Sequence, residues 1–401
     1  MARLWLVWVW VLCLAACDGA PAPMLDASTP EDAAPAVDAG PPEDLDGYLE
    51  WQMRAGGIPG AAMAIVKGTE IAWVGTYGYA DLEAMREVDE HTLFIVASIS
   101  KTMAAVRALQ LVEAGMLDLD APLETYLPYG VRHPAHADVP ITTRMLLTHV
   151  TGLEDNWPML GRATTYGTDP TETLAGFAEG YVTPGGAYYA EGSWGSAPMT
   201  RRTYCNAAFG VVGDVIERAG GASFRAQTSA GIFDVLAMDG AGWFLEDVSA
   251  EHLATPYGWN GRRFSPLPQN GFAFYPASSL RVSVTGLARF ALAIANGGAL
   301  DGARVLSEES VTELLRAQVP DLDRGQALTF SDRSVNGHLY VGHSGSTFGG
   351  SAQMLLSREG DHGILLLTNG DAYVRAELGL EDGAIAMEAI LRRLDEEAHR
   401  L

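Results

Sequence analysis

The sequence predicts an α+β fold of the α/β-sandwich type, in which helices flank a central antiparallel sheet built from both ends of the chain. Apolar, strand-like runs occur near residues 61–77 and again at residues 338–369. The long segment between them, about residues 100–320, is mainly helical in pattern, with loops rich in Gly, Trp and Tyr. Strands at both ends with helices between them indicate one sheet with an inserted helical subdomain.

The N-terminal segment, residues 1–17, has the features of a secretion signal. Arg3 precedes an apolar run, Leu4–Ala16, that is shorter than the roughly 20 residues a membrane-spanning helix needs. The run ends in Leu-Ala-Ala-Cys17, which resembles a bacterial lipoprotein box, so we expect lipidation at Cys17. An ordinary signal peptide cut near the alanine pair is the alternative, and either one predicts an exported protein.

Residues 18–43 form the predicted linker. They are rich in Ala, Pro and acidic residues and contain no basic residue, a composition that cannot bury apolar surface. We therefore expect a disordered tether that joins Cys17 to a folded domain over residues 44–401. This arrangement predicts a protein anchored in the cell envelope, in the periplasm or on the outer surface, which contacts the membrane only through its lipid.

Overall composition excludes some functions. The 401 residues carry a formal net charge of -24, which disfavours binding to the phosphate backbone of a nucleic acid. Of the three cysteines, only Cys205 lies beyond the N-terminal segment, so no disulfide is expected in the folded domain. Lys67 and Lys101 are the only lysines among 26 basic residues. Because Lys can lose its proton and Arg cannot, each lysine is a candidate for chemistry.

The predicted elements follow in chain order. Leu45–Arg54 is expected to be a helix, and Ala61–Lys67 and Ile71–Tyr77 are expected to form a strand pair. Ser98–Ala114 has apolar residues at helical spacing and ends before Gly115.

Near the end of the chain the pattern returns to strands. The predicted elements are three strands and a final helix: His338–Gly342, Ala352–Ser357, Gly363–Asn369 and Val374–Leu394.

Ser98-Ile99-Ser100-Lys101 is the first candidate for chemistry. Positions i and i+3 of a helix share a face, so the hydroxyl of Ser98 and the amine of Lys101 can meet. A serine needs a base to become a nucleophile, and a desolvated lysine with a lowered pKa can be that base. A chance Ser-x-x-Lys on a solvated face is the alternative, and the motif alone does not exclude it.

Two further motifs carry suitable side chains. Tyr204-Cys205-Asn206 precedes a predicted helix; the phenol can share a proton with Lys, and the amide can bind a carbonyl or orient Lys. His343-Ser344-Gly345-Ser346 ends a predicted strand. There, Gly345 would allow close approach of substrate, and the N–H groups of Ser98 and Ser346 could form an oxyanion hole. A core Tyr with a capping Asn, and an ordinary strand-end turn, are the respective alternatives.

The order of these three motifs resembles the serine β-lactamase and penicillin-binding-protein superfamily. The chain looks closest to the class C β-lactamase-related branch of esterases, D-aminopeptidases and D-alanyl-D-alanine carboxypeptidases. The resemblance covers about residues 45–400. It extends to three stretches outside the motifs: Phe94–Ala97, Ile141–Leu153 and Tyr275–Leu280.

The resemblance implies a serine hydrolase that forms an acyl-enzyme on Ser98 and needs no cofactor. Lys101 and Tyr204 would manage the protons, with the identity of the general base left open. Asn206, His343 and Gly345 would contact the substrate, and the amides of Ser98 and Ser346 would hold the oxyanion. The expected substrate is a small ester, peptide or β-lactam-like molecule.

His343 departs from the β-lactamase pattern, because true β-lactamases of this branch usually have Lys there. A largely neutral His favours an esterase or D-amino-acid peptidase over hydrolysis of penicillins or cephalosporins. A β-lactamase, a non-catalytic binder of peptidoglycan peptides and a structural envelope lipoprotein are the alternatives. Cys205 and His149 are interpreted as packing or capping residues. No His or Cys cluster has metal-ligand spacing, so no metal is expected.

Overall fold

The computed structural model describes residues 40–401. The predicted signal peptide, the lipidation site at Cys17 and most of the predicted linker lie outside these residues. Within residues 40–401, no helix combines the length and the apolar character that crossing a bilayer requires.

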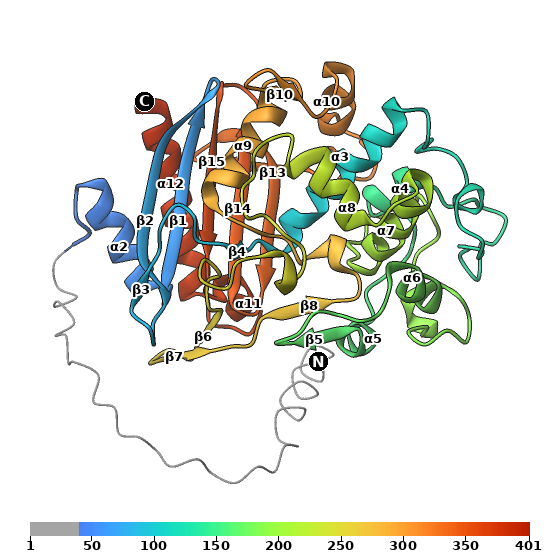
Figure 1. Ribbon diagram of the computed structural model, residues 1–401, viewed down its shortest axis with the longest axis horizontal. Helices are drawn as coiled ribbons and strands as arrows, with labels where there is room; N and C mark the ends of the chain where they lie inside the picture. Colours follow the sequence, from blue (N-terminus) through green and yellow to red (C-terminus); the bar gives the residue numbers. More distant parts are fainter. Residues whose placement is uncertain (1–39) are drawn as a thin grey trace, which may run out of the picture.

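A seven-stranded antiparallel sheet, ordered β12-β13-β14-β15-β1-β2-β3, forms the centre of the molecule (Figure 1). The first strands of the chain and the last ones meet where β1 pairs with β15, with Ala61 opposite Thr368. This confirms the predicted sheet built from both chain ends. The strands are β1 (Gly60–Lys67), β2 (Glu70–Asp81), β3 (Arg86–Glu87), β12 (Ser331–Val335), β13 (His338–Thr347), β14 (Gly350–Ser357) and β15 (His362–Thr368).

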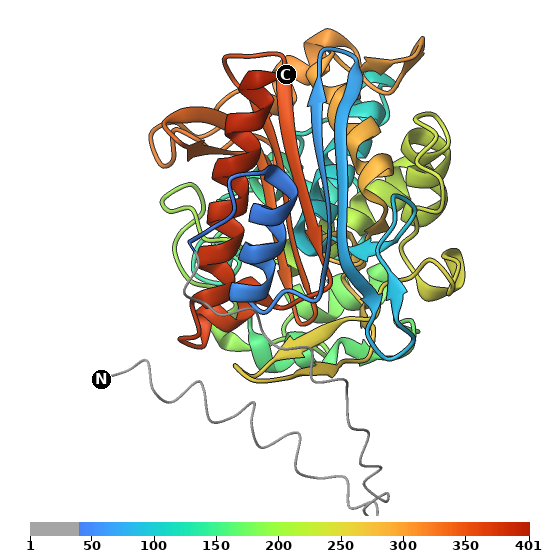
Figure 2. The ribbon, with the colours of Figure 1, turned by 90° about the vertical axis from the view of Figure 1, so that its left-hand side faces the viewer.

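Two helices from opposite ends of the chain, α2 (Leu45–Ala55) and α12 (Asp382–Arg400), cover one face of the sheet (Figure 2). Alternate strand residues such as Met63, Ile65 and Leu366 are fully buried beneath them. Because successive side chains of a strand point to opposite faces, their neighbours belong to the core of the other face. The predicted helix over Leu45–Arg54 is confirmed as α2.

The other face packs against α9 (Val284–Ala295), and beyond it lie α3 (Ser100–Glu113) and α7 (Ala207–Gly220) (Figure 1). The predicted mainly helical region over about residues 100–320 is therefore present. Since α9 lies directly on β1 and β15, this region shares one core with the sheet and is not a separate unit. Its other helices are α4 (Thr143–Leu147), α5 (Trp157–Arg162), α6 (Leu174–Val182), α8 (Phe224–Thr228) and α10 (Glu308–Leu315).

Four short two-stranded ribbons accompany these helices. They pair β4 (Phe94–Ile95) with β9 (Arg281–Val282), β5 (Thr164–Tyr166) with β8 (Asn270–Phe272), β6 (Tyr257–Trp259) with β7 (Phe264–Pro266), and β10 (Ala299–Leu300) with β11 (Ala303–Arg304).

Several predicted element boundaries are wrong, among them the strand Ile71–Tyr77, which runs from Glu70 to Asp81 as β2. The predicted helix Val374–Leu394 is two helices, α11 (Ala372–Glu377) and α12, because Gly379 takes a left-handed φ of 87° between them. The predicted strand His338–Gly342 continues as β13 to Thr347, held in register by β14. The third motif therefore lies within the strand and not at its end.

Candidate active site

The nucleophile motif lies where the helical region meets the sheet. Ser98 sits in a 3₁₀ turn, Ala97–Ile99, that leads directly into α3 and packs against β13. Ala97 has a φ of 45°, a left-handed conformation that is strained for a non-Gly residue and occurs often at functional sites. The 3₁₀ turn followed by the helix still places the two motif side chains together: Lys101 Nζ lies 3.0 Å from Ser98 Oγ.

Lys101 is fully buried and has three polar neighbours. Its Nζ donates to Ser98 Oγ at 3.0 Å, to Asn206 Oδ1 at 2.8 Å and to the carbonyl oxygen of Ala277 at 2.8 Å. Burial lowers the pKa of Lys101 to about 7, although the nearby Asp155 carboxylate opposes this shift. At neutral pH a large fraction of this amine is therefore uncharged and able to accept a proton.

Tyr204 belongs to the same group. It comes shortly before α7, and its hydroxyl lies close enough to Ser98 for that side chain to lower the pKa of the phenol, against the larger effect of burial. The residue is 36% exposed at the surface, yet desolvation around the hydroxyl raises the pKa of Tyr204 above its ordinary value. Its ring also faces Lys101, with Nζ 4.9 Å from the ring centroid. The hydroxyl of Ser98, the amine of Lys101 and the phenol of Tyr204, which the sequence motifs predicted to lie together, are thus neighbours in the structure.

Asp155 is a site residue that the sequence motifs missed. Its carboxylate accepts hydrogen bonds from the backbone N–H of Asn206 at 2.7 Å and of Ala207 at 3.0 Å. It also accepts one from Asn206 Nδ2 at 2.7 Å. Because the amide nitrogen of Asn206 is held by Asp155, its amide oxygen points to Lys101. Asp155 lies two residues after the family-like stretch Ile141–Leu153, which was the only sequence signal near it.

Cys205 and His149 are buried and pack against the Tyr204-Cys205-Asn206 segment and Asp155. Cys205 is buried, its Sγ lies 3.4 Å from an Asp155 carboxylate oxygen, and burial raises the pKa of the thiol well above its usual range. His149 Nδ1 accepts the N–H of Cys205 at 3.2 Å, and its ring lies 4.4 Å from that of Tyr204. Both residues have the packing roles that we expected, and burial keeps His149 neutral by lowering its pKa.

The third motif lies on the part of β13 that extends beyond its pairing with β12. His343 is 8% exposed, its Nδ1 lies 2.6 Å from the carbonyl oxygen of Ser344, and its ring centroid is 6.3 Å from that of Tyr204. Burial and the nearby Lys101 lower the pKa of His343 to about 3, so the ring is neutral at pH 7.

The structure shows a steric reason for glycine at position 345, while the expected approach of substrate to this residue stays a prediction. A Cβ at this position would lie 2.1 Å from the carbonyl oxygen of Val96 and 3.3 Å from the side chain of Ala97. Glycine is therefore required because the backbone just before Ser98 approaches the strand closely. Ser346, one residue further on, is exposed on the same strand and opposite Ser351 of β14. The oxyanion role of the Ser98 and Ser346 amides stays a prediction.

Potential metal ligands gather elsewhere. Among residues 40–401, one group of at least three His, Cys, Asp or Glu side chains has its potential ligand atoms within 4.8 Å of one another: His338, Asp395 and His399. It lies at β13 and α12, on the sheet face opposite α9, and it does not include any of the residues around Ser98.

The fold, the Ser98–Lys101–Tyr204 group and the late strand motif are those of the serine β-lactamase and penicillin-binding-protein superfamily. Residues 45–384 match the β-lactamase family, and the chain belongs to this family.

Individual relatives match over smaller parts. Esterase EstB of Burkholderia gladioli is 30% identical over 214 residues, which are 53% of this chain and 54% of the esterase. The human mitochondrial serine β-lactamase-like protein LACTB is 37% identical over 99 residues, 24% of this chain and 18% of that protein. The matched segment thus spans about half of the esterase and less of LACTB.

Solved structures extend the likeness to nearly the whole domain. The D-amino acid amidase of Ochrobactrum anthropi SV3 has a TM-score of 0.69 at 20% identity, covering 88% of this chain and 99% of the amidase. A penicillin-binding protein of Bacillus halodurans has a TM-score of 0.67 at 22% identity, covering 86% of this chain and 99% of that one. At these identities the likeness establishes the fold.

Proposed function

We propose that the protein is a serine hydrolase that cleaves a small ester or amide through an acyl-enzyme on Ser98. The observation that carries the proposal is the 3.0 Å contact between Ser98 Oγ and a fully buried lysine amine whose pKa burial lowers to about 7. A structural lysine would ordinarily be protonated and exposed. Esterase EstB and the D-amino acid amidase, whose names state ester and amide chemistry, agree with this reaction class.

Lys101 is the general base in this proposal. The neutral amine has two N–H bonds and one lone pair. When the two N–H bonds go to Asn206 Oδ1 and to the carbonyl of Ala277, the lone pair faces Ser98 Oγ. The amine then removes the hydroxyl proton as Oγ attacks the substrate carbonyl, and the positive charge that it gains is partly offset by Asp155.

Tyr204 carries the proton onward. Its raised pKa keeps the phenol protonated at neutral pH, and its hydroxyl adjoins Ser98. The phenol donates its proton to the leaving oxygen or nitrogen and regains one from the Lys101 ammonium. The pair therefore moves one proton from nucleophile to leaving group. Water releases the acyl group in the second half of the reaction by the same route in reverse.

The proposed substrate is one whose binding does not require a positive charge at position 343, in the third motif. His343 is neutral at pH 7, and its Nδ1 already contacts the carbonyl of Ser344. It offers no permanent charge to pair with the carboxylate of a penicillin or cephalosporin. Esters and uncharged amides, D-amino-acid amides included, place no such demand on His343, and they are the substrate class that we propose.

The experiment is a hydrolysis panel of p-nitrophenyl esters, D-alanyl amides and nitrocefin, run on the wild type and Ser98→Ala. We expect ester or amide turnover that the variant loses, together with labelling of Ser98 by a fluorophosphonate probe. Equal turnover by the two proteins would contradict the proposal. Tight binding of D-alanyl peptides without turnover, retained in Ser98→Ala, would instead favour the non-catalytic binding module.

A further inference from the structure

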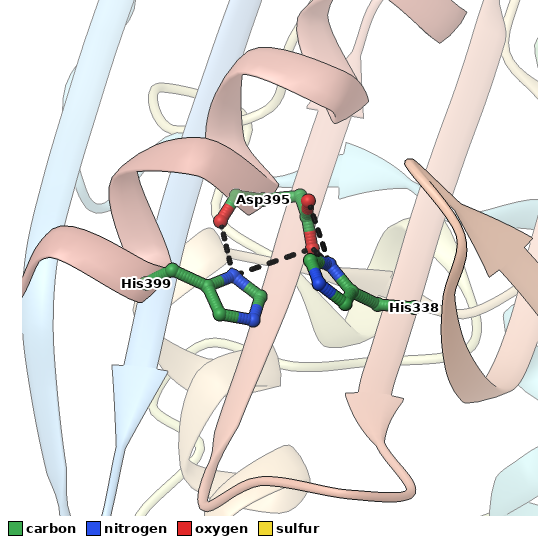
Figure 3. A group of neighbouring side chains, drawn as sticks. All are labelled: His338, Asp395 and His399. Carbon is green, nitrogen blue, oxygen red and sulfur yellow. Dashed lines mark hydrogen bonds and ion pairs between the residues drawn. The ribbon is translucent and has the colours of Figure 1, made fainter.

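A second cluster of functional side chains lies on the face of the sheet that α2 and α12 cover, opposite the α9 face. Asp395 and His399 are four residues apart on α12 and share one helix face, while His338 begins β13 (Figure 3). Both imidazoles point to the same carboxylate: Nδ1 of His338 lies 3.0 Å and Nδ1 of His399 lies 3.6 Å from Asp395 Oδ1. The two rings stack at a centroid distance of 4.1 Å.

The carboxylate at the centre of this cluster is buried without a permanent counter-charge. Asp395 is 1% exposed, and its ion pairs within residues 40–401 are with imidazoles, not with Arg or Lys. Its other hydrogen bonds come from neutral groups, the hydroxyl of Tyr340 at 2.5 Å and Nδ2 of Asn336 at 2.9 Å. Burial of a carboxylate is costly unless a cation or a metal ion compensates it.

We propose that His338, Asp395 and His399 bind one divalent transition-metal ion of the Zn²⁺ type, which fastens α12 to β13. Two imidazole nitrogens and one carboxylate oxygen are a ligand set that suits this ion class. In a tetrahedral site with bonds of about 2.0–2.1 Å, ligand atoms are about 3.3 Å apart. The observed spacings of 3.0 and 3.6 Å bracket that value, and all three ligand atoms lie within 4.8 Å of one another.

The surroundings of the cluster resemble those of a ligand shell. The hydroxyl of Tyr340 joins Asp395 to Nε2 of His362, which lies 2.9 Å from it, and so fixes the carboxylate from behind. Such outer contacts typically orient metal ligands. A surface cavity of about 360 Å³ opens on this cluster and gives an ion an entry path; its lining includes His338, His362, His399, Lys67, Glu359 and Asp361.

Binding of the ion replaces contacts that the side chains now make. Nδ1 of His399 lies 2.8 Å from the backbone carbonyl of Asp395, so this hydrogen bond is exchanged for the metal. Each imidazole must present an unprotonated Nδ1, and its proton moves to the other ring nitrogen or to solvent. Both His side chains are about two-fifths exposed, which makes that exchange accessible to water.

The test measures Zn²⁺ binding by the full chain after chelator treatment, using titration calorimetry and metal analysis after dialysis. We expect one ion per chain and a saturable rise in Tm. His399→Asn and His338→Asn, both on half-exposed side chains, should each weaken binding at least about tenfold, since loss of even an outer-shell partner costs about 10–100-fold. The matched control is His91→Asn with His252→Asn, a second exposed imidazole pair whose rings are 6.3 Å apart.

A substituted ligand supplies a spectroscopic readout. His399→Cys replaces an imidazole with a thiolate, which also binds this class of ion. With Co²⁺ in place of Zn²⁺, the variant should gain a sulfur-to-metal charge-transfer band that the wild type lacks. Labelling of Ser98 by a fluorophosphonate should be unchanged by the metal in all these proteins. Failure of the wild type to take up Zn²⁺, or uptake that survives both Asn variants, would overturn the proposal.

Discussion

Asp155 holds Asn206 by both of its nitrogen groups, the backbone N–H and the side-chain Nδ2, each at 2.7 Å. The amide oxygen of Asn206 is left to face Lys101 Nζ at 2.8 Å. The carboxylate of Asp155 thus orients the amide of Asn206 so that Oδ1, and not Nδ2, faces Lys101. Asp155 is a positioning residue in the proposed reaction, and it also contributes negative charge near the amine.

Asp155→Asn should reduce kcat by about 10²-fold, because a misplaced catalytic group typically costs that much. The substitution removes a charge that raises the pKa of Lys101, so the acid limb of the rate profile should also move to lower pH. Steady-state kinetics across pH measure both effects. Glu154→Gln, the adjacent carboxylate, is the control and should leave both unchanged. A loss of rate without a shift of the acid limb would indicate a purely structural role.

Lys101→Arg should abolish turnover, with a loss of at least about 10²–10⁴-fold, because a guanidinium cannot accept the serine proton. Lys67→Arg is the matched control. It changes the only other lysine, which lies at the end of β1, and should retain full activity. Ester hydrolysis and fluorophosphonate labelling rates provide the measurement. Comparable activity of the two variants would remove Lys101 from the mechanism.

The rate should depend on pH through Lys101. Burial lowers the pKa of this amine to about 7, and only its neutral form accepts a proton. We therefore expect kcat/KM to rise about tenfold per pH unit below that value and to level off above it. His343 has a pKa lowered to about 3 and should add no inflection between pH 5 and 8. A profile that is flat from pH 5 to 8 would rule out this role of the amine.

Gly345→Ala should lower both activity and Tm. The added Cβ would lie 2.1 Å from the carbonyl oxygen of Val96, so either β13 or the turn that carries Ser98 must move. Displacement by about 1 Å is enough to cost roughly 10²-fold in rate. Gly130→Ala, at a position with no atom within 4 Å of the new Cβ, is the control for thermal denaturation and kinetics. Wild-type behaviour of Gly345→Ala would contradict the close approach.

His343→Lys should shift the substrate preference towards β-lactams. A hydrogen bond to a charged group is worth about 1.5–3 kcal/mol, so the ratio of nitrocefin to ester kcat/KM should rise about tenfold or more. His343→Gln keeps the position neutral and should leave the ratio as it is. If the two variants behave alike, the charge of this residue does not select the substrate.

Much of the fold was predictable because its signals are local. Apolar runs marked β1, β14 and β15, which are buried on both faces of the sheet, and helical spacing marked α3. The pattern failed where tertiary contacts decide the structure. β12 is a polar strand beside β13, and it has no apolar pattern from which a strand could be predicted. β13 continues through Ser344-Gly345-Ser346 only because β14 pairs with it. Gly379 divides the last helical segment in a way that side-chain periodicity does not reveal.

The site residues could be predicted where their side chains form short motifs with a fixed spacing in the sequence. Ser98, Lys101, Tyr204 and Asn206 were all found in this way, and the structure brings them together. The carbonyl of Ala277 was missed because a backbone group carries no signature in a sequence. Asp155 was missed because a single acidic residue in a loop resembles any solvated one until its three N–H donors are seen.

The packing of the Ser98 turn against β13 makes the active site dependent on the fold of the last strands. The turn that carries the hydroxyl forms early in the chain, yet the strand against which it is held comes almost 250 residues later. In a partly folded chain, or in one cut before its last strands, β13 is not in place to pack against the turn that carries Ser98. Hydrolysis of a simple ester would thus report that the early and late strands have assembled into one sheet.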